Sequence, residues 1–387
     1  MKKKVQSPFL DFILKEWLLI TSGVGLVVTS IGARRLPAYS FQDFEVLFVL
    51  WILFVSVQGL NNSGLITYIA QKIEQGTFIS FKLVLSTFFL SMVVTNDVAL
   101  IVIVPLTLLL PLRYKGLVVI LEAMAANAGS ALTPFGNPQN LFIYWSYNLS
   151  FGQFVGAIAP FSLTFLVVLG LGAFLLSCAE HSQKKLTFKF FSAPNISFKA
   201  CLQGIKNVNF DFWQAPGISK KAWVYLVLVI FVLLIVLHVL PLATGLIVVF
   251  FALLWDVEAL KVDYSLLVSF FFFFGFSDNI KLFLPPSILS SKHVFLFSAL
   301  ASQLISNVPA ALLFSNFTSN WLGLLWGVNA GGFGSLLGSL ANLIAYKIYI
   351  TRSRTKDLHL FTLQFFILGY VAFFISFGLY FLFMMPR

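Results

Sequence analysis

The stretch TNDVALIVIVP at residues 95–105, with NAGSALTPFGNPQN at 127–140, returns later in the chain as SNVPAALLF at 306–314 with NAGGFGSLLGSLAN at 329–342. Glycine, proline and amide residues are costly inside a membrane-spanning segment unless the irregular backbone lines a cavity or is buried in protein. Their recurrence in the same order therefore predicts a duplicated site on a transport path. The two longer segments align without gaps and share Asn127/Asn329, Ala128/Ala330, Gly129/Gly331, Gly136/Gly338 and Asn140/Asn342, with Thr133 opposite Ser335.

The composition places the chain in the lipid bilayer. Of its 387 residues, 59% are hydrophobic and 10% charged, and the mean hydropathy is +0.94. Such a chain has too little polar surface for a soluble globule, so an all-α polytopic membrane protein is predicted. The net charge of +11 does not indicate nucleic acid, because lysine and arginine lie mostly between apolar segments, where they set topology and contact acidic headgroups. Cys178 and Cys201 have no metal-binding spacing, and no cofactor is expected.

Apolar segments of spanning length alternate with shorter, interrupted ones. A first hairpin is predicted over about 81–112, with arms of about 14 residues that rise roughly 21 Å and so penetrate the bilayer without crossing it. Lys82 lies at one end and Arg113 with Lys115 at the other, so this re-entrant hairpin should open to the cytoplasm. Spans are predicted at roughly 9–32, 41–60, 116–145, 152–178, 223–240, 242–256, 264–284, 321–348 and 359–384.

A second re-entrant hairpin is predicted over about 293–316, although one plain span would also fit this length. The basic linker at 180–222 should be cytoplasmic, and three spans later the chain reaches the outside. Only a hairpin then keeps the basic cluster at 347–356 inside, and Pro309 breaks the helix near the tip. Arg34 and Arg35 fall outside in this topology and run against the charge rule.

The predicted architecture is an inverted repeat in the cell membrane. An N-terminal half at 1–179 carries the first hairpin and a broken helix at about 116–145, and its N-terminus is cytoplasmic with a retained first helix after MKKK. The linker at 180–222 leads to a C-terminal half at 223–387, with the second hairpin and a broken helix at about 321–348. Such repeats are a recurrent plan of secondary transporters, which hold substrate where the halves meet.

The paired motifs resemble the ion transporter superfamily, which includes divalent anion symporters, citrate transporters, arsenite permeases and sodium/proton antiporters. The resemblance covers most of the chain and implies the fold above. In carboxylate symporters the tips read Ser-Asn-Thr and bind sodium and the substrate carboxylate. Here Asp97 and Val308 occupy the third positions, and the Asn96-Asp97 pair is closer to arsenite permeases and related antiporters. Val308 has no hydroxyl, so two equivalent sodium sites are not expected.

Asp97 is the predicted coupling group, because a carboxyl at membrane depth is usually functional and can carry a proton or a cation. The alternative is that Asp97 only caps the second hairpin arm. Glu122, in the third span, is a secondary coupling candidate, and Asp278 is expected to reach water or a basic partner. A sodium ion is predicted near Asn96 and Asn137. The predicted substrate- and ion-binding residues are Thr95, Asn96, Asp97, Thr133, Gly136, Asn137, Ser306, Asn307, Ser335, Gly338 and Ser339.

The predicted function is ion-coupled secondary active transport of a small anion or oxyanion, of the citrate or dicarboxylate class, by alternating access, with sodium or a proton as the coupling ion. Sodium/proton antiport and efflux of a neutral metalloid hydroxide, such as arsenite or antimonite, remain as alternatives on the same fold. A membrane-embedded enzyme is not expected, because the sequence has no GxSxG elbow and no HExxH pair. A homodimer is left open.

Overall fold

The computed structural model describes residues 16–66, 68–69, 77–184, 219, 221–283, 293–352 and 358–384, and these ranges are helical with short connections. The all-α prediction is confirmed. The N-terminal MKKK and most of the basic linker, including residues 185–218, lie outside the described residues, as do residues 284–292 and the basic positions Arg354 and Lys356.

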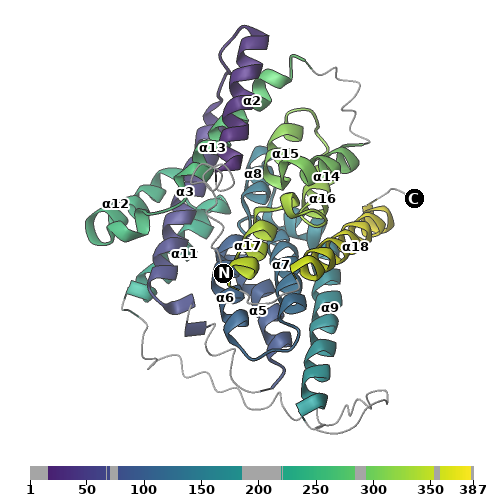
Figure 1. Ribbon diagram of the computed structural model, residues 1–387. Helices are drawn as coiled ribbons and strands as arrows, with labels where there is room; N and C mark the ends of the chain where they lie inside the picture. The colour runs from purple at the N-terminus through teal and green to yellow at the C-terminus, as the bar shows by residue number, and fades with distance from the viewer. Residues whose placement is uncertain are drawn as a thin grey trace, which may run out of the picture.

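The helices form two groups that lie side by side (Figure 1). In the first, called the flanking group, α2 packs on α13, and α3 packs on α11 and α12. Its members are α2 (Trp17–Ala33), α3 (Phe41–Asn62), α11 (Lys221–Val236), the 3-10 turn η3 (Leu242–Gly245), α12 (Leu246–Trp255), the 3-10 turn η4 (Val257–Leu260) and α13 (Tyr264–Ile280).

The second, called the site group, holds both copies of the repeated motifs. Its members are α5 (Ile79–Val94), α6 (Asn96–Leu109), α7 (Lys115–Ala131), α8 (Pro138–Ser146), α9 (Phe151–Lys184), α14 (Val294–Ile305), α15 (Asn307–Ser315), α16 (Trp321–Gly331), the 3-10 turn η5 (Leu336–Gly338), α17 (Leu340–Arg352) and α18 (Leu358–Met384). Equivalent pairs recur, since α5 packs on α7 as α14 packs on α16. The two groups meet where α13 contacts α15 and α3 contacts α8.

Each predicted hairpin is a pair of helices joined by one residue, Thr95 between α5 and α6 and Ser306 between α14 and α15. The arms of each pair pack against each other. The alternative of one plain span over 293–316 is wrong, because Val294 at the start of α14 lies against Gly323 near the start of α16, just after α15 ends.

The hairpins enter the site group from opposite ends (Figure 1). At the base of the first hairpin, the Phe81 amide donates to Ser177 Oγ and Ser80 Oγ donates to Glu180, both near the C-terminal end of α9. At the base of the second, Ser315 and Thr318 carbonyls accept from the Tyr147 hydroxyl, just before α9 begins. We call this second end the outer end, since the charge pattern predicts that it faces outside.

The predicted span at 242–256 is shorter than expected. It is α-helical only over Leu246–Trp255, which at 1.5 Å per residue rises about 15 Å, and a 3-10 turn precedes it. The ion pair between Lys221 Nζ and Asp256 Oδ1, at 2.9 Å, nevertheless brings the chain back to the end where α11 begins. The α11–α12 pair therefore returns to its starting face, as the topology requires.

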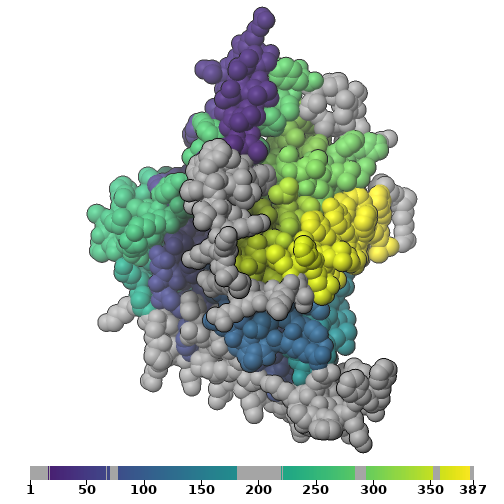
Figure 2. All heavy atoms as spheres, viewed as in Figure 1, coloured from purple at the N-terminus to yellow at the C-terminus, as the bar shows by residue number. Residues whose placement is uncertain are grey.

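The surface carries the apolar residues that lipid requires. Four helical segments, Phe41–Asn62, Phe151–Glu180, Val257–Ile280 and Leu358–Phe383, are long and apolar enough to cross a membrane. Helices α2, α12 and α18 lie at the edges of the molecule (Figure 2) and expose many large apolar side chains. Soluble monomers rarely expose so much contiguous apolar surface, so the chain is a multi-pass membrane protein. Examples are Val24, Val28 and Ile31 on α2, Phe250, Leu254 and Trp255 on α12, and Leu363, Ile367 and Phe374 on α18.

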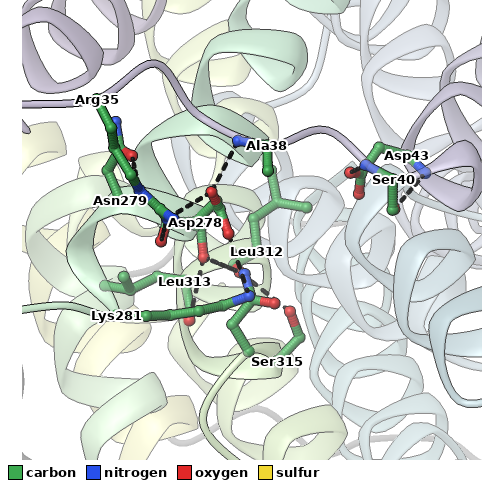
Figure 3. A network of polar contacts seen from close by, with 12 residues as sticks. Arg35, Ala38, Ser40, Asp43, Asp278, Asn279, Lys281, Leu312, Leu313 and Ser315 are labelled. Carbon is green, nitrogen blue, oxygen red and sulfur yellow. Dashed lines mark hydrogen bonds and ion pairs between the residues drawn. The ribbon is translucent and has the colours of Figure 1, made fainter. Parts of the chain in front are cut away.

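The arginine that ran against the charge rule has an acidic partner (Figure 3). Arg35 Nη2 lies 2.8 Å from Asp278 Oδ2 at the end of α13, and Lys281 Nζ lies 3.7 Å from Asp278 Oδ1. The same carboxylate accepts from the Ala38 amide at 2.9 Å. Asp278 thus has the basic partner predicted for it, and the charge of Arg35 is compensated locally.

We expect the hairpin bases to be reachable from opposite faces of the membrane. Single cysteines at Lys82 and Arg113 should react with impermeant thiol reagents from the cytoplasmic side only, and cysteines at His293 and Ser319 from outside only. The background should be a chain without Cys178 and Cys201, and inside-out vesicles provide the matched second orientation. Labelling of positions 82 and 113 from different faces would exclude the first hairpin.

Candidate functional site

The first broken helix is interrupted by local chemistry that the sequence displays. Helix α7 ends at Ala131, and α8 begins at Pro138, whose missing N–H and fixed φ suit a first helical position. Asn137 caps α8 by accepting from the Asn140 amide at 3.0 Å. Between them, Gly136 leaves no room for a side chain, since a Cβ there would overlap the backbone of Ser130.

The second broken helix is also interrupted between two helical segments, but without a proline. Helix α16 ends at Gly331, Gly334 takes φ +84°, and α17 begins only at Leu340. A side chain at Gly338 would overlap the carbonyl oxygens of Gly331 and Phe333. Glycine is required at Gly334 because L side chains rarely adopt its backbone conformation, so the GGFG run supplies the break here.

The two hairpin tips share one strained conformation. Thr95 has φ 80° and ψ 150°, and Ser306 has φ 74° and ψ 156°. Non-glycine residues rarely adopt this region, and each such residue costs roughly 1–3 kcal/mol. The surrounding protein therefore holds both tips in place, and the first tip is tied directly to the first break by the bond from the Asn96 amide to the Gly136 carbonyl.

Four buried asparagines connect the broken helices to each other. Asn127 Nδ2 donates to Asn342 Oδ1 at 2.8 Å, and Asn329 Nδ2 donates to Asn140 Oδ1 at 2.8 Å. Each bond joins one repeat to the other. In both, the first asparagine of one repeat donates to the second asparagine of the other. Asn140 Nδ2 also donates to the Ser130 and Ala131 carbonyls, and Asn342 Nδ2 to the Gly332 and Ser335 carbonyls. The backbone groups released by both breaks are thereby satisfied inside the protein.

The helix breaks and hairpin tips bring four helix N-termini to one small cavity. Its volume is about 20 Å³, room for about one water molecule. The first residues of α6, α8, α15 and α17 line it, and each helix points the positive end of its dipole at the space. The lining residues are Leu18, Asn96, Asp97, Pro138, Gln139, Leu266, Phe270, Ser306, Asn307, Val308, Ser339 and Leu340. None of these described residues is a lysine or an arginine.

The predicted site residues separate into three sets. Asn96, Asp97, Ser306, Asn307 and Ser339 line the cavity, while Thr95, Gly136 and Gly338 shape the tips and breaks beside it.

Other predicted ligands use their polar groups inside the protein. Thr133 Oγ1 donates to the Met92 carbonyl, Asn137 Nδ2 to Ser130 Oγ, and Ser335 Oγ to the Gln303 carbonyl. The Thr133 and Ser335 bonds brace each break against its hairpin, and the Asn137 bond lies within the first break. The binding roles of these residues stay predictions.

Asp97 is not the cap of its helix. The N-cap position of α6 is Thr95, and Asp97 lies in the first turn, where its own amide donates to Asn96 Oδ1. Asp97 Oδ1 is buried and, among the described residues, has no hydrogen-bond partner. Asp97 therefore makes no capping hydrogen bond, although its place in the first turn still suits the positive end of the α6 dipole, and it lines the cavity.

The four asparagines are repeated positions in the sequence, but they are not among the predicted site residues. Gln303 was not predicted either. Its Nε2 donates to the Gly331 carbonyl at 2.8 Å, and its Oε1 accepts from the Ser335 amide at 2.7 Å. The recurrence of Asn127, Asn140, Asn329 and Asn342 in matched places was the available signal. Gln303 has no counterpart in the repeated motif, so the sequence carried no signal for it.

The arrangement is that of a membrane transporter: the tips of two helical hairpins and two broken helices meet at one small cavity inside a lipid-facing helical body. Comparisons with known proteins identify the family. A family model described as citrate transporter matches residues 13–320, and the chain belongs to this family. Families and relatives of this kind are transporters rather than enzymes.

Relatives extend the comparison over nearly the whole chain. An uncharacterized transporter of Methanocaldococcus jannaschii is 32% identical over 86% of this chain and 88% of its own length. The inner membrane protein YbiR of Escherichia coli is 32% identical over 89% of this chain and 90% of its own. The silicon efflux transporter of Oryza sativa subsp. japonica is 29% identical over 44% of this chain and 36% of its own.

We expect the breaks to reject side chains. Gly136→Ala and Gly338→Ala should each destabilise the protein by roughly 1–3 kcal/mol, because the added carbon meets backbone that cannot move aside, and leucine should abolish transport. Thermal unfolding in detergent and flux in proteoliposomes measure the two effects. Gly156→Leu is the matched control, since nothing lies within 4 Å of a Cβ there. Normal flux in well-folded Gly136→Leu would contradict the role of the break.

Proposed function

We propose that this protein is an ion-coupled secondary active transporter of a small anion or oxyanion, working by alternating access. The observation that carries the proposal is the meeting of four helix N-termini on one cavity without a cationic side chain among its described lining residues. Helix N-termini attract anions through their dipoles and their free amide groups. The family match and the carboxylate class in its name support the same solute chemistry.

The hydroxyl and amide groups of the cavity complete the proposed site. Asn96 and Asn307 hold equivalent positions on the two tips, and Ser306 and Ser339 add hydroxyls. These groups can donate to an oxyanion or offer oxygen to a sodium ion. At about 20 Å³, the cavity admits one water-sized group, so a solute of several atoms requires the walls to separate. Alternating access supplies that separation.

Asp97 is the proposed coupling group. Its unpartnered Oδ1 in an apolar body favours a bound proton or a sodium ion over a bare charge. Either ion would also remove the repulsion between the carboxylate and an anionic solute. Val308 stands at the equivalent place on the second tip, so the proposal has one coupling carboxyl rather than two.

Two alternatives rest on particular observations. The single carboxyl at the tip also suits sodium/proton antiport, in which both ions compete for Asp97. No lysine or arginine is among the described lining residues, which suits a neutral hydroxide such as arsenite or antimonite. A relative that matches only part of the chain is named a silicon efflux transporter.

Polar contacts between the two helix groups support a gate at the outer end. Gln42 Nε2 donates to the Trp145 carbonyl, and Trp145 Nε1 donates to the Val236 carbonyl. Asn316 Nδ2 donates to Ser277 Oγ, which in turn donates to the Leu312 carbonyl at 2.9 Å. These bonds join α8 and α15, the half-helices that run from the cavity to the outer end, to the flanking group.

Aromatic contacts lie in the same region. Phe142 packs on Phe274 at 5.6 Å between ring centroids, and His238 packs on Trp145 at 4.5 Å. Burial lowers the pKa of His238, with Glu45 acting in the opposite direction. Of the flanking residues that reach the cavity, Leu266 and Phe270 precede Phe274 and Ser277 along α13, and Leu18 lies at the start of α2. We infer that the outer gate is closed in this conformation.

The proposed function is tested by a solute screen in proteoliposomes with imposed proton or sodium gradients. Wild-type protein should accumulate one of citrate, another small oxyanion, arsenite or silicic acid against its gradient. Asp97→Asn should lose this uphill accumulation yet retain exchange, because the amide imitates the neutral acid but releases no proton.

Asp97→Glu, which keeps the carboxyl, is the matched comparison for that experiment. Uphill transport by stable Asp97→Asn at the wild-type rate would remove Asp97 from coupling. Chemical conversion of the solute, followed by mass spectrometry, would contradict transport itself.

The gate can be tested separately from the solute. Ser277→Ala removes the hydroxyl that links α13 to α15, and a net hydrogen bond of about 1 kcal/mol corresponds to about fivefold in the open population. A cysteine at Val308, on the tip, should therefore react about fivefold faster with an impermeant reagent from outside. Ser269→Ala, whose hydroxyl bonds only within α13, is the control. Unchanged outside labelling would contradict a gate at Ser277.

A further inference from the structure

Glu122 is a fully buried carboxyl that the proposed transport cycle does not use. It lies on α7 with 0% of its surface exposed, and its Oε1 is hydrogen-bonded to Thr107 Oγ1 on α6. Its Oε2 has no partner among the described residues. In the part of the chain that the structure describes, the ion pairs involve Asp256, Glu258 and Asp278 rather than Glu122. A bare carboxylate in such a place would be strongly unfavourable.

The proton count at Thr107 assigns a proton to this carboxyl. Thr107 Oγ1 contacts two oxygens, the Ile103 carbonyl at 3.2 Å and Glu122 Oε1. A hydroxyl has one proton to donate, and a backbone carbonyl only accepts. Both contacts are hydrogen bonds when Thr107 donates to Ile103 and accepts from a protonated Glu122.

We propose that Glu122 is a proton-binding site, separate from the cavity, whose bound proton joins α6 to α7 and stays in place during transport. Helix α6 then has two protonatable neighbours with different roles. Asp97 at its first turn faces the cavity, whereas Glu122 contacts it near its far end at Thr107. The first exchanges ions with the solute path, and the second holds the hairpin arm against the broken helix.

The second repeat shows that packing alone does not require an acid here. Glu122 lies five residues before Asn127, and the residue five before Asn329 is Leu324, which is also fully buried. The equivalent joint is thus built with an apolar side chain. The acid in the first repeat adds a hydrogen bond between two helices, and it provides that bond only while it carries its proton.

Infrared difference spectroscopy tests the proposal without any solute. Wild-type protein at neutral pH should show the carbonyl band of a protonated carboxylic acid that disappears in Glu122→Gln. Glu122→Leu introduces the residue found at the equivalent position of the second repeat and should lose the same band. It replaces Glu122→Gln in the experiment if the glutamine variant does not fold. Thr107→Val should shift the band, because its hydrogen-bond acceptor is gone, while Thr107→Ser should not. Subtracting the spectrum of Asp97→Asn from that of the wild type identifies the band of Asp97, the other buried carboxyl, and so separates it from the band of Glu122.

Two results would overturn the assignment. An unchanged carboxylic acid band in both Glu122 variants would show that Glu122 carries no proton. Loss of uphill transport in folded Glu122→Gln, with exchange retained, would show that the proton leaves during the cycle, because the amide can donate to Thr107 as the acid does. Failure of the transport proposal itself would leave the infrared result intact, so the two can be told apart.

Discussion

The structure depends on satisfying broken backbone inside an apolar body. Each interrupted helix releases carbonyl and amide groups where water is scarce, and each such group is costly if left unpaired. Asn140 and Asn342 supply donors to the carbonyls of their own breaks, while Asn127 and Asn329 bind them across the repeats. Because the two bonds cross between repeats, neither half can complete its own break without the other. The cavity therefore exists only where both halves meet, which is the place a transported solute needs.

The same breaks create the electrostatics of the site. A helix that stops and restarts inside the protein presents a second N-terminus at depth, and the hairpin tips add two more. Four positive dipole ends then face one space without the desolvation problem of a buried lysine. The repeats are equal in backbone but unequal in charge, since Asp97 and Glu122 occur where the second copy has Val308 and Leu324. Symmetry thus provides the shape of the site, and departure from symmetry provides the protonatable groups, Asp97 at the cavity and Glu122 apart from it.

Much of this could be predicted from the sequence because its strongest signals are local. The repeated Asn-Ala-Gly segments, Pro138 and the paired glycines indicated the breaks. The Thr95-Asn96-Asp97 triplet and the Ser306-Asn307 pair indicated the tips. What could not be predicted depends on contacts between distant segments. Arg35 runs against the charge rule in the sequence, and its ion-pair partner, Asp278, lies far along the chain. Gln303 gave no signal because its role comes from carbonyls on α16 and in the second break. Thr133 and Ser335 have the chemistry of ligands, and only their acceptors, Met92 and Gln303, show that they brace the hairpins.

The half-helices α8 and α15 connect the cavity to the boundary between the helix groups. Their first residues line the cavity, and their far ends bond to the flanking group through Trp145, Leu312 and the adjoining Asn316. Helices this short, of nine residues each, transmit a displacement at one end to the other because their interior hydrogen bonds keep them rigid. An ion or solute that moves the tip at Asn307 therefore acts directly on the contact with Ser277. In the proposed cycle, occupancy of the cavity and closure of the inferred outer gate are linked through a single element in each repeat.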